Sequence, residues 1–302
     1  MRALELTTDL AAFGARLTDP VLVLATDGWT DAGAAGSSAA ELLLDDFGAE
    51  QVGAFDPDAL YDYRDRRPVI EIDQGTLGEP RWPGLDVELV TPPSGPALVV
   101  VTGAEPDLRW RTVVADLVEL ANAIGARRYV GLGAVPGPLP HTRPVQLICT
   151  SSDEDLLARF GRPHEQVVVP ASFQVAAEAQ LRTAGLTTLG LWARLPHYVA
   201  TDYPAATKAL LERFSAFTGT PVDVSGLDAP IADQREQLDE AAEASEEITE
   251  HIRGLESMYD AMITDEGAQR SEGSGTPLSS EQVPSGDEIA AELERFLRGR
   301  AD

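Results

Sequence analysis

The sequence predicts an α/β fold: a three-layer α/β/α sandwich around a largely parallel, mixed sheet, with a C-terminal helical appendage. Short apolar runs alternate with helix-length segments over residues 1–225, and the composition turns strongly acidic from residue 226 onward. Strands separated by helices of this length are typical of parallel sheets that helices cover on both faces. The 302 residues are 43% hydrophobic, which is enough for a sizeable core.

The clearest strand is expected over residues 97–102, a continuous run of apolar and β-branched residues. Such runs suit a central strand that is buried on both faces. Prolines 92, 93 and 96 crowd the candidate at 87–91 and favour an edge position for it. The other expected strands cover residues 21–26, 52–55, 68–72, 128–132, 146–150, 167–169 and 188–193.

The clearest helix is expected over residues 109–124. Val113, Leu117 and Ile124 recur at helical spacing, and Gly125 follows as a C-terminal cap. Further helices are expected over 32–47, 153–160, 173–184 and 205–217.

Residues 226–302 are predicted to form an acidic helical region apart from the 1–225 core. Residues 231–302 contain 19 acidic and six basic residues, so this quarter of the chain carries nearly half of the net charge of -27. We expect a long helix over 229–263, a flexible linker over 264–285 and a short helix over 286–298. The long helix either folds back on its own domain or protrudes to grip another subunit. Its seven-residue repeat consists of Ile231, Leu238, Ser245, Ile252 and Tyr259, with Ala241, Ile248, Leu255 and Met262.

Charge and cysteine content exclude several classes of function. A net charge of -27 argues against nucleic acid and anionic membrane surfaces as partners, because both attract basic proteins. A single cysteine, Cys149, excludes an internal disulfide, and its apolar strand context predicts a buried small side chain. The four histidines lack metal-ligand spacing, so we expect neither a metal nor a cofactor.

Targeting signals are not expected in this sequence. Residues 1–20 lack a basic segment followed by a long apolar stretch, which a secretory signal requires. No apolar run approaches the ~20 residues of a membrane span. A cytoplasmic location is therefore predicted.

The loop at 27–33 follows a predicted strand, at the edge where open α/β sheets bind ligands. Asp27 and Asp31 flank Trp29 there, with Gly28 between them and Gly33 at the end of the loop. One interpretation is a turn and helix cap with the indole covering the end of the sheet. The other is a functional loop.

The loop at 103–111 precedes the clearest helix, which Asp107 can cap. Arg109 and Arg111 fall in the first helical turn, where the helix dipole disfavours cations. Either an acidic side chain pairs with them, or they help to bind an anion. Trp110 lies between the two arginines.

The loop at 137–144 holds His141, Thr142 and Arg143 between prolines, which stiffen the backbone. Rigid display of a histidine and an arginine suits acid–base chemistry beside an anion, and it equally suits an interface network. A later polar and aromatic cluster begins at His197 and Tyr198.

An enzyme is one hypothesis that these loops support. It would be a phosphorylase-, hydrolase- or amide-ligase-like enzyme acting on an anionic small molecule. Its catalytic candidates are Asp27, Asp31, Arg109, His141 and Arg143, which would have to converge on one pocket. The sequence contains none of the standard phosphate-loop, zinc-protease or serine-hydrolase motifs.

Taken in order, the loops resemble the bacterial and archaeal branch of the proteasome assembly chaperone 2 family. The match covers about residues 15–225 together with the acidic helical tail. The segments that carry it are DGWTDAG at 27–33, FDPD at 55–58, YDYR at 61–64, RP at 67–68, GAEPD at 103–107, RW at 109–110 and PHTRP at 140–144.

The resemblance implies a core similar to the nucleoside phosphorylase and peptidyl hydrolase architecture. It also implies homo-oligomers, trimers among them, and a non-enzymatic assembly-chaperone or scaffold role that includes proteasome subunits as partners. Under this second hypothesis the residues expected at protein contacts are Trp29, Trp110, Arg111, Thr142, His197 and Tyr198.

Overall fold

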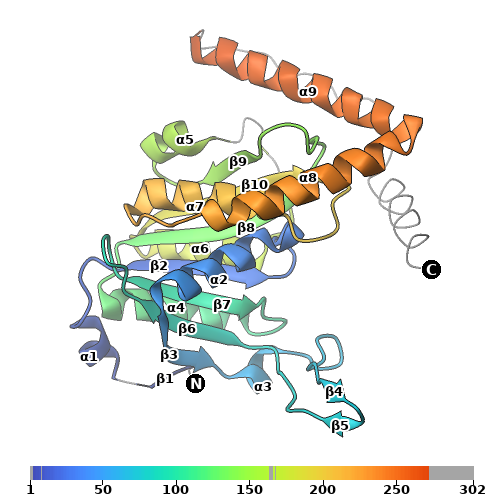
Figure 1. The fold of residues 1–302 in the computed structure, drawn as a ribbon. Coiled ribbons are helices and arrows are strands. Elements are labelled where there is room, and N and C mark those ends of the chain that lie inside the picture. The colour runs from blue at the N-terminus through green and yellow to red at the C-terminus, as the bar shows by residue number, and fades with distance from the viewer. Residues whose placement is uncertain (1–2, 8, 163–165, 167, 272–302) are drawn as a thin grey trace.

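The chain forms an eight-stranded mixed sheet between two helical layers (Figure 1). The computed structural model describes residues 3–7, 9–162, 166 and 168–271. In spatial order the strands are β1 (Leu4–Leu6), β3 (Ala49–Phe55), β6 (Leu85–Val90), β7 (Leu98–Ala104), β2 (Val21–Asp27), β8 (Arg128–Gly137), β10 (Thr187–Pro196) and β9 (Gln146–Thr150).

Four parallel strands, β7, β2, β8 and β10, form the centre of this sheet, and antiparallel strands flank them on both sides. The first six residues of β2 are buried, because helices cover both faces of the central strands. The predicted three-layer α/β/α fold with a largely parallel, mixed sheet is confirmed. The four parallel strands end on the same edge, so the loops that follow them share one side of the molecule.

The two helical layers enclose two separate apolar cores. Helices α1, α4 and α6 cover one face, where Phe13 and Leu117 pack with Leu24 of β2. Helices α2 and α7 cover the other, where Leu43 and Phe214 pack on the sheet. The helices are α1 (Leu10–Gly14), α2 (Ala35–Phe47), α3 (Pro57–Leu60), α4 (Trp110–Ile124), α5 (Glu154–Phe160), α6 (Phe173–Thr183) and α7 (Pro204–Thr218), with 3-10 turns at Ala32–Ala34 and Ser225–Leu227.

Two predicted strands are wrong. The strand expected at 68–72 is instead part of a small hairpin, β4 (Ile72–Asp73) and β5 (Thr76–Leu77), outside the main sheet. At 167–169, Val168 and Val169 lie in no strand and are 97% and 67% exposed. The valines and isoleucines of both segments are therefore exposed rather than packed in the main sheet.

Strand β8 is longer than the glycines and prolines at 133–140 predicted. Its backbone continues to Gly137 because β10 pairs with it along its whole length. Gly133 permits this: a Cβ there would lie 2.5 Å from the Trp192 ring and 2.9 Å from the Thr30 carbonyl oxygen. The glycine thus accommodates a close approach rather than ending the strand.

The single helix expected over 229–263 is instead two helices, α8 (Asp228–Glu243) and α9 (Glu246–Ser271), which meet at a sharp corner (Figure 1). The Ser245 hydroxyl accepts a hydrogen bond from Ile248 N–H (3.4 Å) and begins α9 as a cap. Ile252 and Leu255 are buried against the core, so the repeat faces the chain's own body. Helix α9 occupies residues 264–271, where the linker was expected; the rest of the linker and the 286–298 helix lie outside the described residues.

A buried carboxyl group lies between α6 and the sheet. Glu178 is 8% exposed and accepts a hydrogen bond from the Thr150 hydroxyl (2.6 Å), which in turn accepts one from the Trp192 indole (3.0 Å). Burial raises the pKa of Glu178 to about 7, although the bonds from Thr150 and Thr188 oppose the shift. The folded protein therefore binds a proton here more tightly than the unfolded chain does.

We predict that Glu178→Gln makes the protein more stable at pH 8 and that the gain disappears toward pH 4.5. The raised folded pKa means that wild-type stability is full below the unfolded value of 4.5 and is lost as pH rises to about 7. The difference in unfolding free energy reaches about 3 kcal/mol at pH 8. Urea unfolding between pH 5 and 8 measures it, with Glu41→Gln on the exposed side of α2 as control. A difference that does not change with pH would contradict this account.

Candidate functional site

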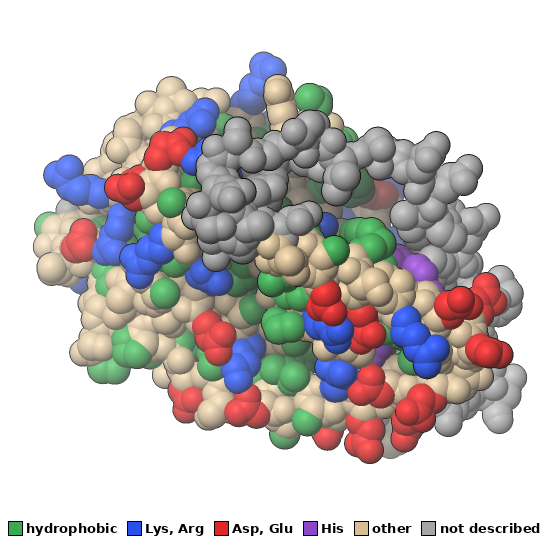
Figure 2. Space-filling view, turned by 90° about the horizontal axis from the view of Figure 1, so that it is seen from above, with side chains coloured by type: hydrophobic (Ala, Val, Ile, Leu, Met, Phe, Trp, Pro, Cys, Tyr) green, Lys and Arg blue, Asp and Glu red, His purple; other side chains and the backbone are tan. Residues whose placement is uncertain are grey.

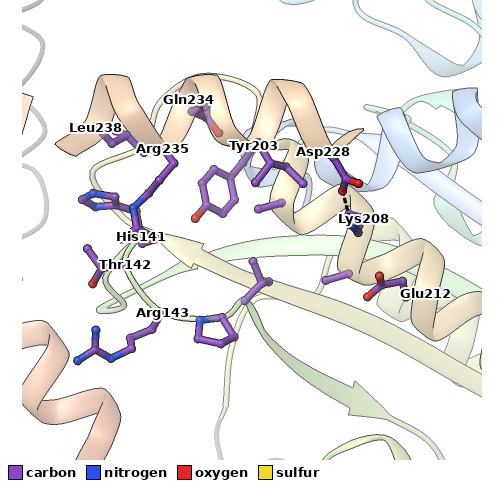
Figure 3. A pocket seen from close by; sticks show the side chains of 15 residues that line it. His141, Thr142, Arg143, Tyr203, Lys208, Glu212, Asp228, Gln234, Arg235 and Leu238 are labelled. Atoms are coloured by element: carbon purple, nitrogen blue, oxygen red, sulfur yellow. Dashed lines mark hydrogen bonds and ion pairs between the residues drawn. The ribbon is translucent and has the colours of Figure 1, made fainter. Parts of the chain in front are cut away.

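The loop between β8 and β9 contacts the C-terminal helices. Most of the polar residues that were predicted to be functional in this loop form hydrogen bonds to those helices. Residues 138–145 lie between the edge of the sheet and the α8–α9 pair (Figure 3). His141, Thr142 and Arg143 each bond to a residue on α8 or α9, about a hundred positions later in the chain. We call this set of contacts the seam.

His141 is the buried centre of the seam. Its backbone N–H donates to the Tyr198 hydroxyl (2.8 Å), and its Nδ1 lies 2.7 Å from the same oxygen. Its Nε2 lies 3.0 Å from Asp239 Oδ1 on α8. The hydroxyl that accepts from the backbone can donate its one hydrogen to Nδ1, which leaves the ring hydrogen on Nε2 to bond Asp239.

This environment favours a neutral imidazole. Burial lowers the pKa of His141, and the carboxylate of Asp239 only partly opposes the shift. Partial burial raises the pKa of Asp239, but hydrogen bonds from Arg235 and His141 outweigh it and hold this pKa below its usual value. Arg235 also donates to the His141 carbonyl (3.2 Å), so the imidazole ring and the backbone carbonyl of His141 are both bonded to α8.

Arg143 fastens the loop to α9. Its Nε and one terminal nitrogen donate to the two oxygens of Asp260 (2.9 and 2.8 Å), and its other terminal nitrogen donates to Glu256 (3.0 Å). This two-pronged bond to Asp260 lowers the pKa of that carboxyl group. Thr142 donates its hydroxyl to Glu256 as well. The guanidinium is therefore already occupied by carboxylates.

A cavity of about 580 Å³ opens beside the seam, between α7 and α8 (Figure 3). His141 and Arg143 line one end, and Lys208 lines the other, where it pairs with Asp228. Arg235 lines it as well, and both arginines bond to carboxylates of α8 and α9 that lie outside the lining. A nucleophile with an adjacent free base is not present among its lining residues.

The five catalytic candidates are not brought together. Asp27 pairs with Arg66 (2.7 Å) at the end of β2. Asp31 is buried and accepts bonds from Gly36 N–H and from Ser37, at the start of α2; burial raises its pKa. Neither carboxylate lines the cavity that holds His141 and Arg143.

Arg109, the fifth candidate, is exposed at the start of α4, where its backbone takes the left-handed conformation (φ 58°). Arg111 is exposed as well. The acidic partner expected for these two arginines does not appear: among the described residues neither forms an ion pair. Both guanidinium groups remain open to solvent or to another molecule.

The residues predicted for protein contacts divide into two groups. Thr142, His197 and Tyr198 belong to the seam, where His197 lies against His251 of α9 (5.7 Å between ring centres). Trp29 is 69% exposed at the carboxyl ends of the strands. Trp110 is half-buried, donates a hydrogen bond to the Pro106 carbonyl and packs edge-on against Phe173 (5.8 Å between ring centres). These contacts stabilise the loop at 103–111.

Sequence reasoning missed the partners in the seam. Asp239, Glu256 and Asp260 lie among many acidic residues of α8 and α9, and their neighbours Leu238 and Leu255 belong to the buried repeat. Their position beside these apolar residues was the sequence feature that could have identified them. Glu105 was also missed: its two oxygens accept from Trp29 N–H (3.3 Å) and Phe173 N–H (2.7 Å) and join two loops.

Cys149 is buried, as its strand context predicted, and burial raises the pKa of its thiol to about 11. In the described residues, no group of three histidine, cysteine, aspartate or glutamate side chains could hold a metal ion. Within those same segments no helix is long and apolar enough to span a bilayer.

Comparison with known proteins identifies the family of this chain. The model of the PAC2 family matches residues 25–242, from the middle of β2 into α8. The chain belongs to the PAC2 family. The resemblance found in the sequence is thereby confirmed. No curated protein matches the chain.

Several solved structures resemble this PAC2 family protein. Mycobacterium tuberculosis Rv2714, described as of unknown function, is 32% identical with a TM-score of 0.80 and covers 89% of this chain and 92% of its own. Rv2125 of the same organism, a proteasome-assembly chaperone homologue, is 30% identical with a TM-score of 0.71, covering 77% and 99%. Pyrococcus furiosus PbaB, an archaeal proteasome activator, is 16% identical with a TM-score of 0.62, covers 78% and 97%, and shares the fold.

We predict that Arg143→Ala loosens α9 without unfolding the core. The substitution removes the bonds to Glu256 and Asp260, so amide hydrogen exchange over residues 246–264 accelerates roughly fivefold while β2 and β7 stay protected. Arg162→Ala, which removes the exposed ion pair with Glu154 on α5, is the control and leaves α9 unchanged. Equal exchange in both variants would show that the seam does not hold the helix.

Proposed function

We propose that this PAC2 family protein is a cytoplasmic, non-enzymatic assembly-chaperone-like or scaffold protein that acts through protein–protein contacts, with proteasome subunits as its partners. The observation that carries the proposal is an acidic surface on α8 and α9. Its carboxylates are exposed and form no ion pairs within the described residues. They are Asp233, Glu236, Glu240, Glu243, Glu246, Glu247 and Glu250.

This acidic surface has the chemistry of a docking site for a basic protein. Figure 2 shows acidic side chains gathered where α8 meets α9, at the right of that view. Unpaired charges of one sign raise the rate at which an oppositely charged partner associates and reject partners of like charge. The seam holds the two helices in place, so the carboxylates are presented on a fixed frame.

The residues that could have served catalysis support the same proposal. Both ring nitrogens of His141 and all three guanidinium nitrogens of Arg143 form hydrogen bonds inside the chain. These groups therefore hold the helices rather than face a substrate. Proteasome subunits are the partners of choice because Rv2125 is described as a proteasome-assembly chaperone homologue and shares 30% identity with this chain.

The test compares three forms of the full chain in binding to purified proteasome α subunits of the native host. We expect the wild type to bind, with an affinity that falls as salt rises, because salt screens exposed charges. The variant Glu236→Gln/Glu240→Gln/Glu243→Gln, altered on one face of α8, binds at least about tenfold more weakly.

The matched control is Glu41→Gln/Asp45→Asn/Asp46→Asn, which removes the same charge from exposed positions of α2 and retains wild-type affinity. If the wild type does not bind the α subunits, the proteasome link fails. If both triple variants lose affinity equally, net charge rather than this surface is responsible.

A further inference from the structure

A second hollow, of about 340 Å³, lies between α5, β9 and α7 (Figure 1, upper left). Helix α7 contributes one stripe to its wall, Ala209, Glu212, Arg213 and Ala216, whose spacing places them on the same side of the helix. The two alanines are too small to fill the space between α7 and α5. The volume is within the range of ligand pockets, which starts at about 300 Å³. We call this hollow the α5–α7 pocket.

Two arginines of the α5–α7 pocket lie against one aromatic ring. The guanidinium carbon of Arg159 is 4.8 Å from the centre of the Phe160 ring, and that of Arg213 is 5.7 Å from it. Phe160 is 2% exposed, so its ring is fixed in the core. Arg159 also donates to the Ala216 carbonyl (3.0 Å), which attaches α5 to the end of α7. Two cations are therefore held at one place by cation–π contacts and a hydrogen bond.

No acidic side chain neutralises these two cations. Neither Arg159 nor Arg213 forms an ion pair with a described residue, whereas Arg162, just beyond α5, pairs with Glu154. Acidic residues outnumber basic ones in this chain by 50 to 23, so an arginine without an acidic partner is unexpected. The carboxylate among the lining residues is that of Glu212, which is exposed and unpaired within the described residues. The lining thus has one more positive than negative charge.

The remaining wall of the α5–α7 pocket is apolar. Leu147 of β9 and Val145, just before that strand, are partly buried and pack against the core beside Phe160. A molecule that occupies the pocket therefore meets guanidinium groups on one side and hydrocarbon on the other. Planar guanidinium groups bind carboxylates through paired hydrogen bonds and stack on flat aromatic surfaces.

We propose that the α5–α7 pocket binds a small aromatic carboxylate. The carboxylate would accept hydrogen bonds from Arg159 and Arg213, and the ring would cover Leu147 and the alanines of α7. Because Glu212 adds a negative charge to the same wall, a singly charged ligand fits better than a phosphate dianion. The proposal goes beyond the protein partners proposed above, since the lining includes no residue of the seam or of the acidic surface on α8 and α9.

The first test titrates the full chain with 2-naphthoate in a calorimeter. We expect one molecule to bind per chain with a Kd of about 1 mM or tighter. Arg159→Gln and Arg213→Gln each weaken binding at least about tenfold, because each removes a charge-assisted hydrogen bond to the probe. Arg162→Gln, which removes a cation outside the pocket, is the matched control and binds as the wild type does. Thermal melts verify that every variant is folded.

The second test separates recognition of the charge from burial of the ring. We expect the wild type to bind neutral 2-naphthamide at least about tenfold more weakly than 2-naphthoate, and Arg213→Gln to bind the two alike. Arg213 donates no hydrogen bond to any described residue, so its substitution removes none from the fold. Ala216→Leu retains both arginines but fills the pocket, and we expect it to abolish binding.

A further variant distinguishes this pocket from the cavity beside the seam, which adjoins it and shares Val145, Ala209 and Glu212 with it. Lys208→Gln, altered in that cavity alone, retains wild-type affinity for 2-naphthoate. The proposal is overturned if 2-naphthoate does not bind, if the amide binds equally well, or if Lys208→Gln rather than Arg213→Gln loses affinity.

Discussion

The structure depends on the burial of both faces of its four central parallel strands. Val21 to Ala25 alternate between two apolar cores, Val23 toward α2 and α7 and Leu24 toward α4 and α6. A strand in that position can hold no polar side chain without a partner, because water reaches neither face. Polar residues are therefore displaced to the strand ends, and the carboxyl-end loops collect them. The positions of Asp27, Asp31 and His141, at or just after the carboxyl ends of these strands, agree with this constraint.

At those ends, geometry rather than residue type decides what each polar group does. His141 and Arg143 have the chemistry for catalysis, yet each is surrounded by hydrogen-bond partners from α8 or α9. Arg109 and Arg111 have less distinctive chemistry, yet they remain open. A buried and saturated polar group rigidifies a fold, whereas an exposed and unsaturated one is available for recognition. The first pair is bonded within the chain, whereas the second pair is exposed.

The sequence allowed the layers to be predicted because their signals are local. The apolar run at 97–102 and the amphipathic helix that ends at Gly125 each carry their own pattern, and both elements formed where expected. The seam could not be predicted, since the partner of His141 lies 98 residues away on a helix with many equivalent acids. The corner at Ser245 was missed for a related reason. The apolar repeat continues through it, so the pattern hid the hydroxyl that begins a second helix.

The covalent link between α7 and α8 has a consequence for the strength of the seam. Because the two helices are tethered to the core, their contacts form at the high effective concentration of a short linker, on the order of millimolar. Individually weak ion pairs such as that of Arg143 with Asp260 can then keep the helices closed most of the time. The same weakness lets them open as a unit far more often than the whole domain unfolds. We therefore expect the two helices to open together at a lower free energy than the sheet, although Ile252 and Leu255 share its core.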